Sequence, residues 1–185
     1  MKKFIPYGRQ DISSEDIQSV VDVLNSDFLT QGQIVPDFEQ SLMSLCNSKF
    51  ASAMSSATAA LHLACKALDL GPGDIMWTSP ISFVASANCA LYCGAKVDFV
   101  DIDPESNNIS IAALEEKLIF AESINALPKV VIPVHLAGLS CDMKAIDALA
   151  KRYKFKVIED ASHAIGGTYN GEPIGNCRYS DICVF

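Results

Sequence analysis

Two adjacent carboxylates, Glu159 and Asp160, follow the apolar residues Val157 and Ile158, and His163 comes three residues after Asp160. A buried strand that runs directly into two acids is costly unless a partner compensates their charge. Three kinds of partner suit these residue types. Asp160 can cap a following turn, or the acids and His163 can ligate a metal ion. Alternatively, a carboxylate can face a protonated heterocyclic nitrogen, which supplies the positive charge.

A run of small and hydroxyl residues, Ser55-Ser56-Ala57-Thr58, lies between an apolar segment and a helical pattern. Small residues let backbone N–H groups approach an anion, and the helix dipole favours negative charge, so the run can bind a phosphate. It equally fits an ordinary helix N-cap. No G-x-G-x-x-G or G-x-x-x-x-G-K-[ST] motif supports a dinucleotide or P-loop site. Phe83, at the start of another helical pattern, can stack on a flat ligand or pack in the core.

Two further histidines lie in apolar surroundings. His62 falls within an apolar helical pattern and His135 follows the segment VVIPV, and we expect both to be structural. A metal-dependent enzyme that uses Glu159, Asp160, His163 and His135 is an alternative, although the spacing matches no strong metal motif.

The composition bounds the class of protein. With 185 residues, 50% of them hydrophobic, the chain can bury a sizeable core and suits one domain. Its net charge of -8 argues against nucleic-acid or anionic-membrane partners, because no excess of Lys and Arg can neutralise phosphates. We identify no signal peptide and no membrane span. The seven cysteines form no C-x-x-C pair, which predicts neither zinc nor disulfides and favours a reducing, cytoplasmic location.

Helical and strand patterns alternate along the chain. Short strands spaced by helices of about three turns are typical of βαβ units and a mostly parallel sheet covered on both faces. Ligands of such sheets bind at the carboxyl ends of the strands, where the polar residues described above lie. The patterns predict helices over 13–24, 36–46, 59–70, 83–93, 111–120 and 142–153, and strands over 50–54, 75–78, 96–102, 129–134 and 155–158.

These motifs together resemble a known family. SSATAALHLACKALDLGPGD, SPISFVASANCALYCGAKVDFVDID, VVIPVHLAGLSCDM and KVIEDASHAIGGTYNGEPIG resemble successive motifs of the DegT/DnrJ/StrS sugar aminotransferases. NSDFLTQG, TSPISFVASAN and EDASHAIGG are most similar to the UDP-4-amino-4,6-dideoxy-N-acetyl-β-L-altrosamine transaminases (PseC type) of that family. The resemblance implies an α/β, aspartate-aminotransferase-like large domain (PLP fold type I). Residues 1–185 would form its N-terminal part, with a helical segment over 1–48 and an α/β core over 49–185.

The resemblance also implies a cofactor, pyridoxal 5'-phosphate (PLP), and roles for individual residues. Phe83 would stack on the pyridine ring, Asp160 would pair with its protonated nitrogen, and His163 would hydrogen-bond near its hydroxyl group. Ala57 and Thr58 would hold the phosphate. Other residues would help to bind the nucleotide-sugar or the cofactor: Tyr7, Asp27, Phe28, Leu29, Thr30 and Ser56.

In the family, an S-F-H-x-x-K segment follows the Val-Phe pair that is Val184-Phe185 here. Its lysine forms the Schiff base with the cofactor and moves the proton, so Asp160 and His163 would be supporting residues and this chain alone would be inactive. The full-length enzyme would be a homodimer. It would transfer the amino group of L-glutamate to the 4-keto carbon of a UDP-linked 4-keto-6-deoxy-N-acetyl hexose, in pseudaminic acid or surface-glycan synthesis. A catalytically inactive binding or regulatory protein on the same fold is the alternative.

Overall fold

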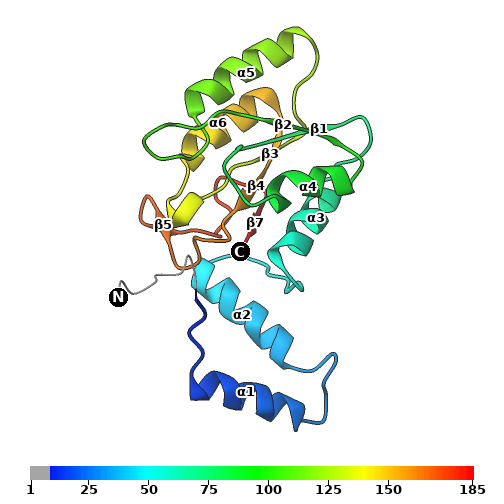
Figure 1. Cartoon of the computed structure of the whole chain (residues 1–185), viewed down its shortest axis with the longest axis vertical. Helices are drawn as coiled ribbons and strands as arrows, with labels where there is room; N and C mark the ends of the chain where they lie inside the picture. Colours follow the sequence, from blue (N-terminus) through cyan, green and yellow to red (C-terminus); the bar gives the residue numbers. More distant parts are fainter. Residues whose placement is uncertain (1–8) are drawn as a thin grey trace, which may run out of the picture.

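Five parallel strands form the central sheet of the computed structural model, which describes residues 9–185 (Figure 1). The strands of the chain are β1 (Ile75–Thr78), β2 (Lys96–Phe99), β3 (Val130–Ile132), β4 (Lys156–Asp160), β5 (Thr168–Tyr169), β6 (Glu172–Pro173) and β7 (Ile182–Val184). The sheet has the order β2-β1-β3-β4-β7, whereas β5 and β6 form a separate antiparallel hairpin. The parallel α/β class that the sequence predicts is therefore confirmed.

Helices cover both faces of the sheet. The two on one side are α3 (Ala57–Ala67) and α4 (Ala85–Tyr92), and the two on the other are α5 (Ile111–Ser123) and α6 (Met143–Tyr153) (Figure 1). The strands alternate accordingly. Met76 and Ile158 pack with α3 and α4, while their neighbours Trp77 and Val157 pack with α5 and α6. Because both faces are apolar, these strands read as continuous hydrophobic runs rather than alternating ones.

Polar side chains fix where α3, α5 and α6 begin. The hydroxyl of Ser56 accepts a hydrogen bond from the N–H of Ala59 at the start of α3, at 3.2 Å. Ser110 caps α5 in the same way, and the carboxylate of Asp142 caps α6. Such caps satisfy N–H groups that have no partner inside the helix. They set the direction in which each helix leaves its strand end.

Two further helices, α1 (Ser14–Leu24) and α2 (Ile34–Cys46), extend away from the α/β core (Figure 1). Ser13 and Asp16 form a capping box at the start of α1, as the Ser-x-x-Asp spacing predicts. No residue of α1 is buried, and the side chains of its apolar stripe are more than half exposed at Ile17, Val20 and Leu24. The helical pattern is thus present without a covering layer.

The strand predicted over residues 50–54 is wrong, because that segment has no regular secondary structure and pairs with no strand of residues 9–185. The N–H of Ala53 instead donates to the carboxylate of Glu39 on α2, at 2.8 Å. The Glu39 side chain therefore accepts the hydrogen bond that a neighbouring strand would accept in a β-sheet. The hairpin and β7 were not predicted from the sequence. Within residues 9–185, no helix is both long and apolar enough to cross a membrane.

Candidate functional site

A hollow lies at the carboxyl edge of the sheet, where the sequence predicts convergence of polar residues. It is formed by the start of α3, the segment before α4, the turn after β3, and the end of β4. We call it the strand-end hollow. Its lining comprises Ala57, Thr58, Leu61, Ser82, Phe83, Ala85, Val134, His135, Leu136, Asp160, Ser162 and His163.

The carboxylate of Asp160 is buried at the base of this hollow, with 4% of the residue exposed. Its Oδ2 accepts a hydrogen bond from the hydroxyl of Ser86 at 2.6 Å, and its Oδ1 accepts from the hydroxyl of Ser162 at 2.7 Å. Both donors are neutral. Among residues 9–185, no Lys, Arg or His forms an ion pair with Asp160. A buried carboxylate held only by neutral donors is suited to a cationic group of a ligand.

Glu159 lies on the opposite face of β4, because successive strand residues point to opposite sides of a sheet. Its Oε2 is 2.8 Å from Nε2 of His135, and its Oε1 accepts from the hydroxyl of Ser180. Nδ1 of His135 accepts from the N–H of Cys141, so Nε2 carries the ring proton and donates it to Glu159. The partner of the second acid is therefore a fully buried structural histidine, as the sequence predicts for His135.

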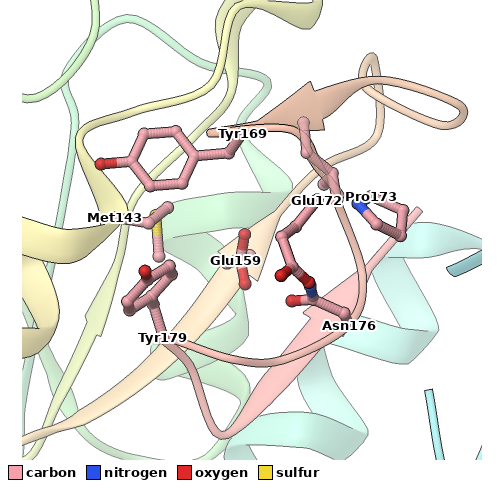
Figure 2. Close-up of a pocket in the computed structure, with 8 residues that line it drawn as sticks. Met143, Glu159, Tyr169, Glu172, Pro173, Asn176 and Tyr179 are labelled. Atoms are coloured by element: carbon pink, nitrogen blue, oxygen red, sulfur yellow. The ribbon is translucent and has the colours of Figure 1, made fainter. Parts of the chain in front are cut away.

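A second hollow lies on this opposite side, beside the β5-β6 hairpin. Figure 2 shows Glu159 near its centre, with Met143 and Tyr179 on one side and Glu172 and Asn176 on the other. Burial raises the pKa of the nearby Cys141 thiol to about 12, so that thiol stays protonated and is not a nucleophile. Glu159 and Asp160 thus face different hollows, and no group of three His, Cys, Asp or Glu within residues 9–185 is placed to hold a metal ion. The metal alternative receives no support.

The start of α3 forms one wall of the strand-end hollow. Ser56 is its N-cap, and Ala57 and Thr58 line the hollow directly. The N–H groups of Ala57 and Thr58 belong to the first turn and have no partner within the helix. Together with the hydroxyl of Thr58 and the positive end of the helix dipole, they can bind a phosphate.

Phe83 and His163 complete the hollow. Phe83 precedes α4 and is 74% exposed, so it does not pack in the core of the described residues. His163 is exposed, and its Nδ1 accepts from the N–H of Ala137 at 3.3 Å. An exposed aromatic ring on the rim, a buried acid at the base and a phosphate-binding helix start suit a flat, phosphorylated heterocycle.

The structure separates the remaining predicted residues from this hollow. The loop with Asp27, Phe28, Leu29 and Thr30 joins α1 to α2 and does not line it. Tyr7 lies outside the described residues. Sequence reasoning missed Ser86, which is fully buried and holds the carboxylate of Asp160. The sequence marks Ser86 only as a serine on the otherwise apolar, buried side of α4.

The chain is similar in sequence and in structure to known aminotransferases. It is 40% identical over 183 residues to the UDP-4-amino-4-deoxy-L-arabinose–oxoglutarate aminotransferase of Shewanella sediminis, covering 99% of this chain and 45% of the relative. It is 38% identical over 182 residues to the UDP-4-amino-4,6-dideoxy-N-acetyl-β-L-altrosamine transaminase of Campylobacter jejuni, covering 98% and 46%. The chain also matches the solved structure of a sugar aminotransferase from Streptococcus pneumoniae in its PLP form, with a TM-score of 0.85 and 29% identity. This match covers 97% of the present chain and 47% of that protein.

The chain spans under half the length of these relatives. A model of the DegT/DnrJ/EryC1/StrS aminotransferase family matches residues 10–185. This range includes every residue that lines the strand-end hollow. The chain belongs to the DegT/DnrJ/EryC1/StrS aminotransferase family.

Proposed function

We propose that the protein carrying this chain is a PLP-dependent aminotransferase that moves the amino group of L-glutamate to the 4-keto carbon of a UDP-linked 4-keto-6-deoxy-N-acetyl hexose. The observation that carries the proposal is Asp160, a buried carboxylate with neutral partners at the base of the strand-end hollow. The named activities of the relatives from Shewanella sediminis and Campylobacter jejuni support a UDP-sugar as the amino acceptor.

The residues of the hollow fit PLP. Asp160 offers a buried negative charge to a protonated ring nitrogen, and Phe83 offers an exposed aromatic face. The first turn of α3 offers N–H groups and the Thr58 hydroxyl to a phosphate. These three features match the cationic nitrogen, the flat ring and the phosphate of one cofactor.

When bound, PLP supplies an electron sink for the carbon that loses or gains the amino group. Asp160 would hold the proton on the ring nitrogen, because a charged acceptor in a buried site makes a strong hydrogen bond. Ser86 and Ser162 would fix the two carboxylate oxygens. Thr58 would bind the phosphate, and Phe83 would limit the tilt of the ring.

Three further parts of the proposal concern the whole protein. The residue that anchors PLP covalently is a lysine outside residues 1–185, so a polypeptide of these residues alone is inactive. The full-length enzyme is a homodimer, as in the resembling family. It works in the cytoplasm, which the seven free cysteines support, because thiols persist in a reducing compartment.

The function can be tested with a matched pair of variants in the protein that carries this chain. Asp160→Asn removes the charge that faces the ring nitrogen, and we expect PLP affinity to fall about 10- to 100-fold, the range for one charge-assisted hydrogen bond. Glu159→Gln makes the same chemical change one residue away, on the other face of β4. The measurement is a titration with PLP followed by its absorbance.

Glu159→Gln is expected to lower the free energy of unfolding by about 1–3 kcal/mol, because it disturbs a buried hydrogen-bonded group. It should leave PLP affinity within about twofold of the unmodified protein. Equal loss of PLP affinity in both variants would show that the effect is structural and would contradict the role of Asp160.

A further inference from the structure

The turn that follows β3 is held in an unusual conformation beside the strand-end hollow. Ala137 has φ 52° and ψ 23°, a left-handed conformation that is costly for any residue with a Cβ atom. Gly138 follows with φ 88°, and a Cβ atom there would lie 3.0 Å from the carbonyl oxygen of His163. The turn therefore packs closely against the backbone of His163. Such a conformation persists only where its surroundings impose it.

Asn108 imposes it from the opposite side. This residue is 3% exposed, and its side chain bonds to both ends of the turn. Its Nδ2 donates to the carbonyl of Leu139 at 2.9 Å, and its Oδ1 accepts from the N–H of Leu136 at 3.1 Å. Only one orientation of the amide satisfies a carbonyl and an N–H together. Leu136 and Leu139 bracket Ala137, so the two hydrogen bonds fix the strained residue from both sides.

Asn108 is itself rigidly placed. Its carbonyl accepts from the N–H of Asp103 at 2.8 Å, and Ile102 and Ile109 form a bridge on either side of the loop. The carboxylate of Asp103 also accepts from the N–H and hydroxyl of Ser106. The amide of Asn108 thus extends from a braced loop, which makes it able to hold another segment in place.

The turn has a direct consequence for His163. The N–H of Ala137 donates to Nδ1 of the ring, so in the neutral ring Nε2 carries the proton. His163 lines the strand-end hollow with Asp160 and Phe83. A ring held in this way presents an N–H donor, rather than an acceptor, to an oxygen of a ligand in the hollow.

We propose that Asn108 is a positioning residue for cofactor binding: it holds the turn 136–139 so that the N–H of Ala137 orients the His163 ring as an Nε2–H donor. The inference rests on the proposed function for the identity of the ligand. The arrangement of Asn108, Ala137 and His163 is independent of the proposed function, because these hydrogen bonds are present without a ligand. Asn108 acts only through His163 and does not line the hollow.

A double-mutant cycle tests the proposal in the protein that carries this chain. Asn108→Ala is expected to weaken PLP binding about fivefold, the equivalent of one displaced hydrogen bond. In a His163→Ala background the same change should have no further effect, because two residues that act as one unit are not additive. Equal weakening in both backgrounds would show a general structural role and overturn the proposal.

Asn176→Ala is the matched control. Its amide also uses both ends, donating to Glu172 at 3.2 Å and accepting from the N–H of Arg178 at 2.9 Å, but it braces the turn after β6. This variant should leave PLP affinity unchanged in either background. An effect as large as that of Asn108→Ala would count against a specific role for Asn108.

A second readout needs no cofactor. The ring nitrogens of His163, labelled with ¹⁵N and assigned with His163→Gln, report which nitrogen carries the proton. We expect a single Nε2–H form in the unmodified protein and a mixture of forms in Asn108→Ala. Asn108→Asp, which keeps the side-chain size, replaces it if the alanine variant does not fold. An unchanged ring spectrum in the folded variant would refute the positioning, whereas failure of PLP to bind the unmodified protein would refute only the proposed function.

Discussion

Asp160 and Glu159 are adjacent in the sequence but belong to different chemical environments. Glu159 is satisfied within the protein by His135 and Ser180, on the side of β4 that faces α6. Within the part of the chain that the structure describes, the carboxylate of Asp160 accepts only from the hydroxyl of Ser86 and from the hydroxyl and N–H of Ser162. The alternation of a strand thus assigns one acid to the framework and leaves the other for a ligand. Groups of the protein itself therefore compensate Glu159, whereas Asp160 can be compensated by a cationic group of a ligand.

Ser86 holds the carboxylate of Asp160 and deserves a direct test. Ser86→Ala removes a fully buried donor to Oδ2, so we expect the free energy of unfolding to fall by about 1–2 kcal/mol. PLP affinity should fall about 3- to 10-fold, because Oδ2 of Asp160 loses the donor that fixes it while Ser162 still holds Oδ1. Chemical denaturation and PLP titration measure the two effects.

Ser123→Ala is the control for this variant, since among residues 9–185 the hydroxyl of Ser123 bonds only to the carbonyl of Phe120, at the exposed end of α5. It should change stability by less than about 0.5 kcal/mol and PLP affinity not at all. If Ser86→Ala lost stability but bound PLP normally, Ser86 would support the fold rather than the orientation of Asp160.

The sequence could identify the acid at the site but not what holds it. Asp160, Thr58 and Phe83 follow strand ends or begin helices, so the position rule for parallel sheets and the family resemblance both point to them. Ser86 contacts Asp160 across 74 positions of the chain. That contact depends on how α4 packs on the sheet, which periodicity does not determine. Asn108 is unpredictable for the same reason, because its partners lie 28 and 31 positions away.

At the scale of elements, an ion pair joins the start of β1 to the start of β3. Nζ of Lys129 lies 2.9 Å from the carboxylate of Asp74, which also accepts from the N–H of Gly71. The hydrogen bond from Lys129 lowers the pKa of Asp74 below its ordinary value of 3.8. The folded protein therefore binds this proton less tightly than the unfolded chain does, and the resulting stability is present above about pH 4.

Asp74→Asn should remove that contribution. We expect the variant to be less stable than the unmodified protein by about 0.2–1 kcal/mol above pH 4, a small value because both side chains are partly exposed. The difference should shrink as the pH falls below 3.8 through the lowered native pKa of Asp74. Free energies of unfolding measured by denaturant from pH 6 to pH 2 give the comparison, and a difference independent of pH would refute the assignment.

Element prediction succeeded where both periodicity and burial were strong. The apolar run 75–78 matches β1 at both ends, and helix 142–153 differs from α6 by one residue. Residues 50–54 are also mostly apolar, yet the N–H of Ala53 donates to the carboxylate of Glu39 and the segment pairs with no strand among the described residues. Strands as short as β5, β6 and β7 carry too few residues for a pattern. Composition cannot reveal which partner a backbone donor finds.

At the scale of the molecule, the described residues expose several large apolar side chains, many of them on α1, on α2 and in the segments that follow these helices. The stripe on α1 is uncovered, and so are Phe28, Phe38 and Phe50 near the ends of α1 and α2. Phe83 also remains largely exposed on the rim of the strand-end hollow. The longer relatives have more than half of their length outside the match to this chain. In the proposed function the exposed ring of Phe83 would leave the bound cofactor open to water within residues 9–185.

The last prediction concerns the polypeptide of residues 1–185 made alone. It retains Asp160, Phe83 and Thr58, so we expect weak, reversible binding of PLP. It should not transfer an amino group from glutamate to a UDP-4-keto sugar. In the proposed function the lysine that anchors the cofactor and moves the proton would belong to an S-F-H-x-x-K segment outside residues 1–185, and each such role is typically worth about 10²-fold or more in rate. Borohydride treatment should accordingly fix no PLP to an active-site lysine of this polypeptide, whereas a protein that includes the S-F-H-x-x-K segment should be labelled at that lysine and active. Clear turnover by residues 1–185 alone would contradict the assignment, because a group within the described hollow would then have to supply both roles.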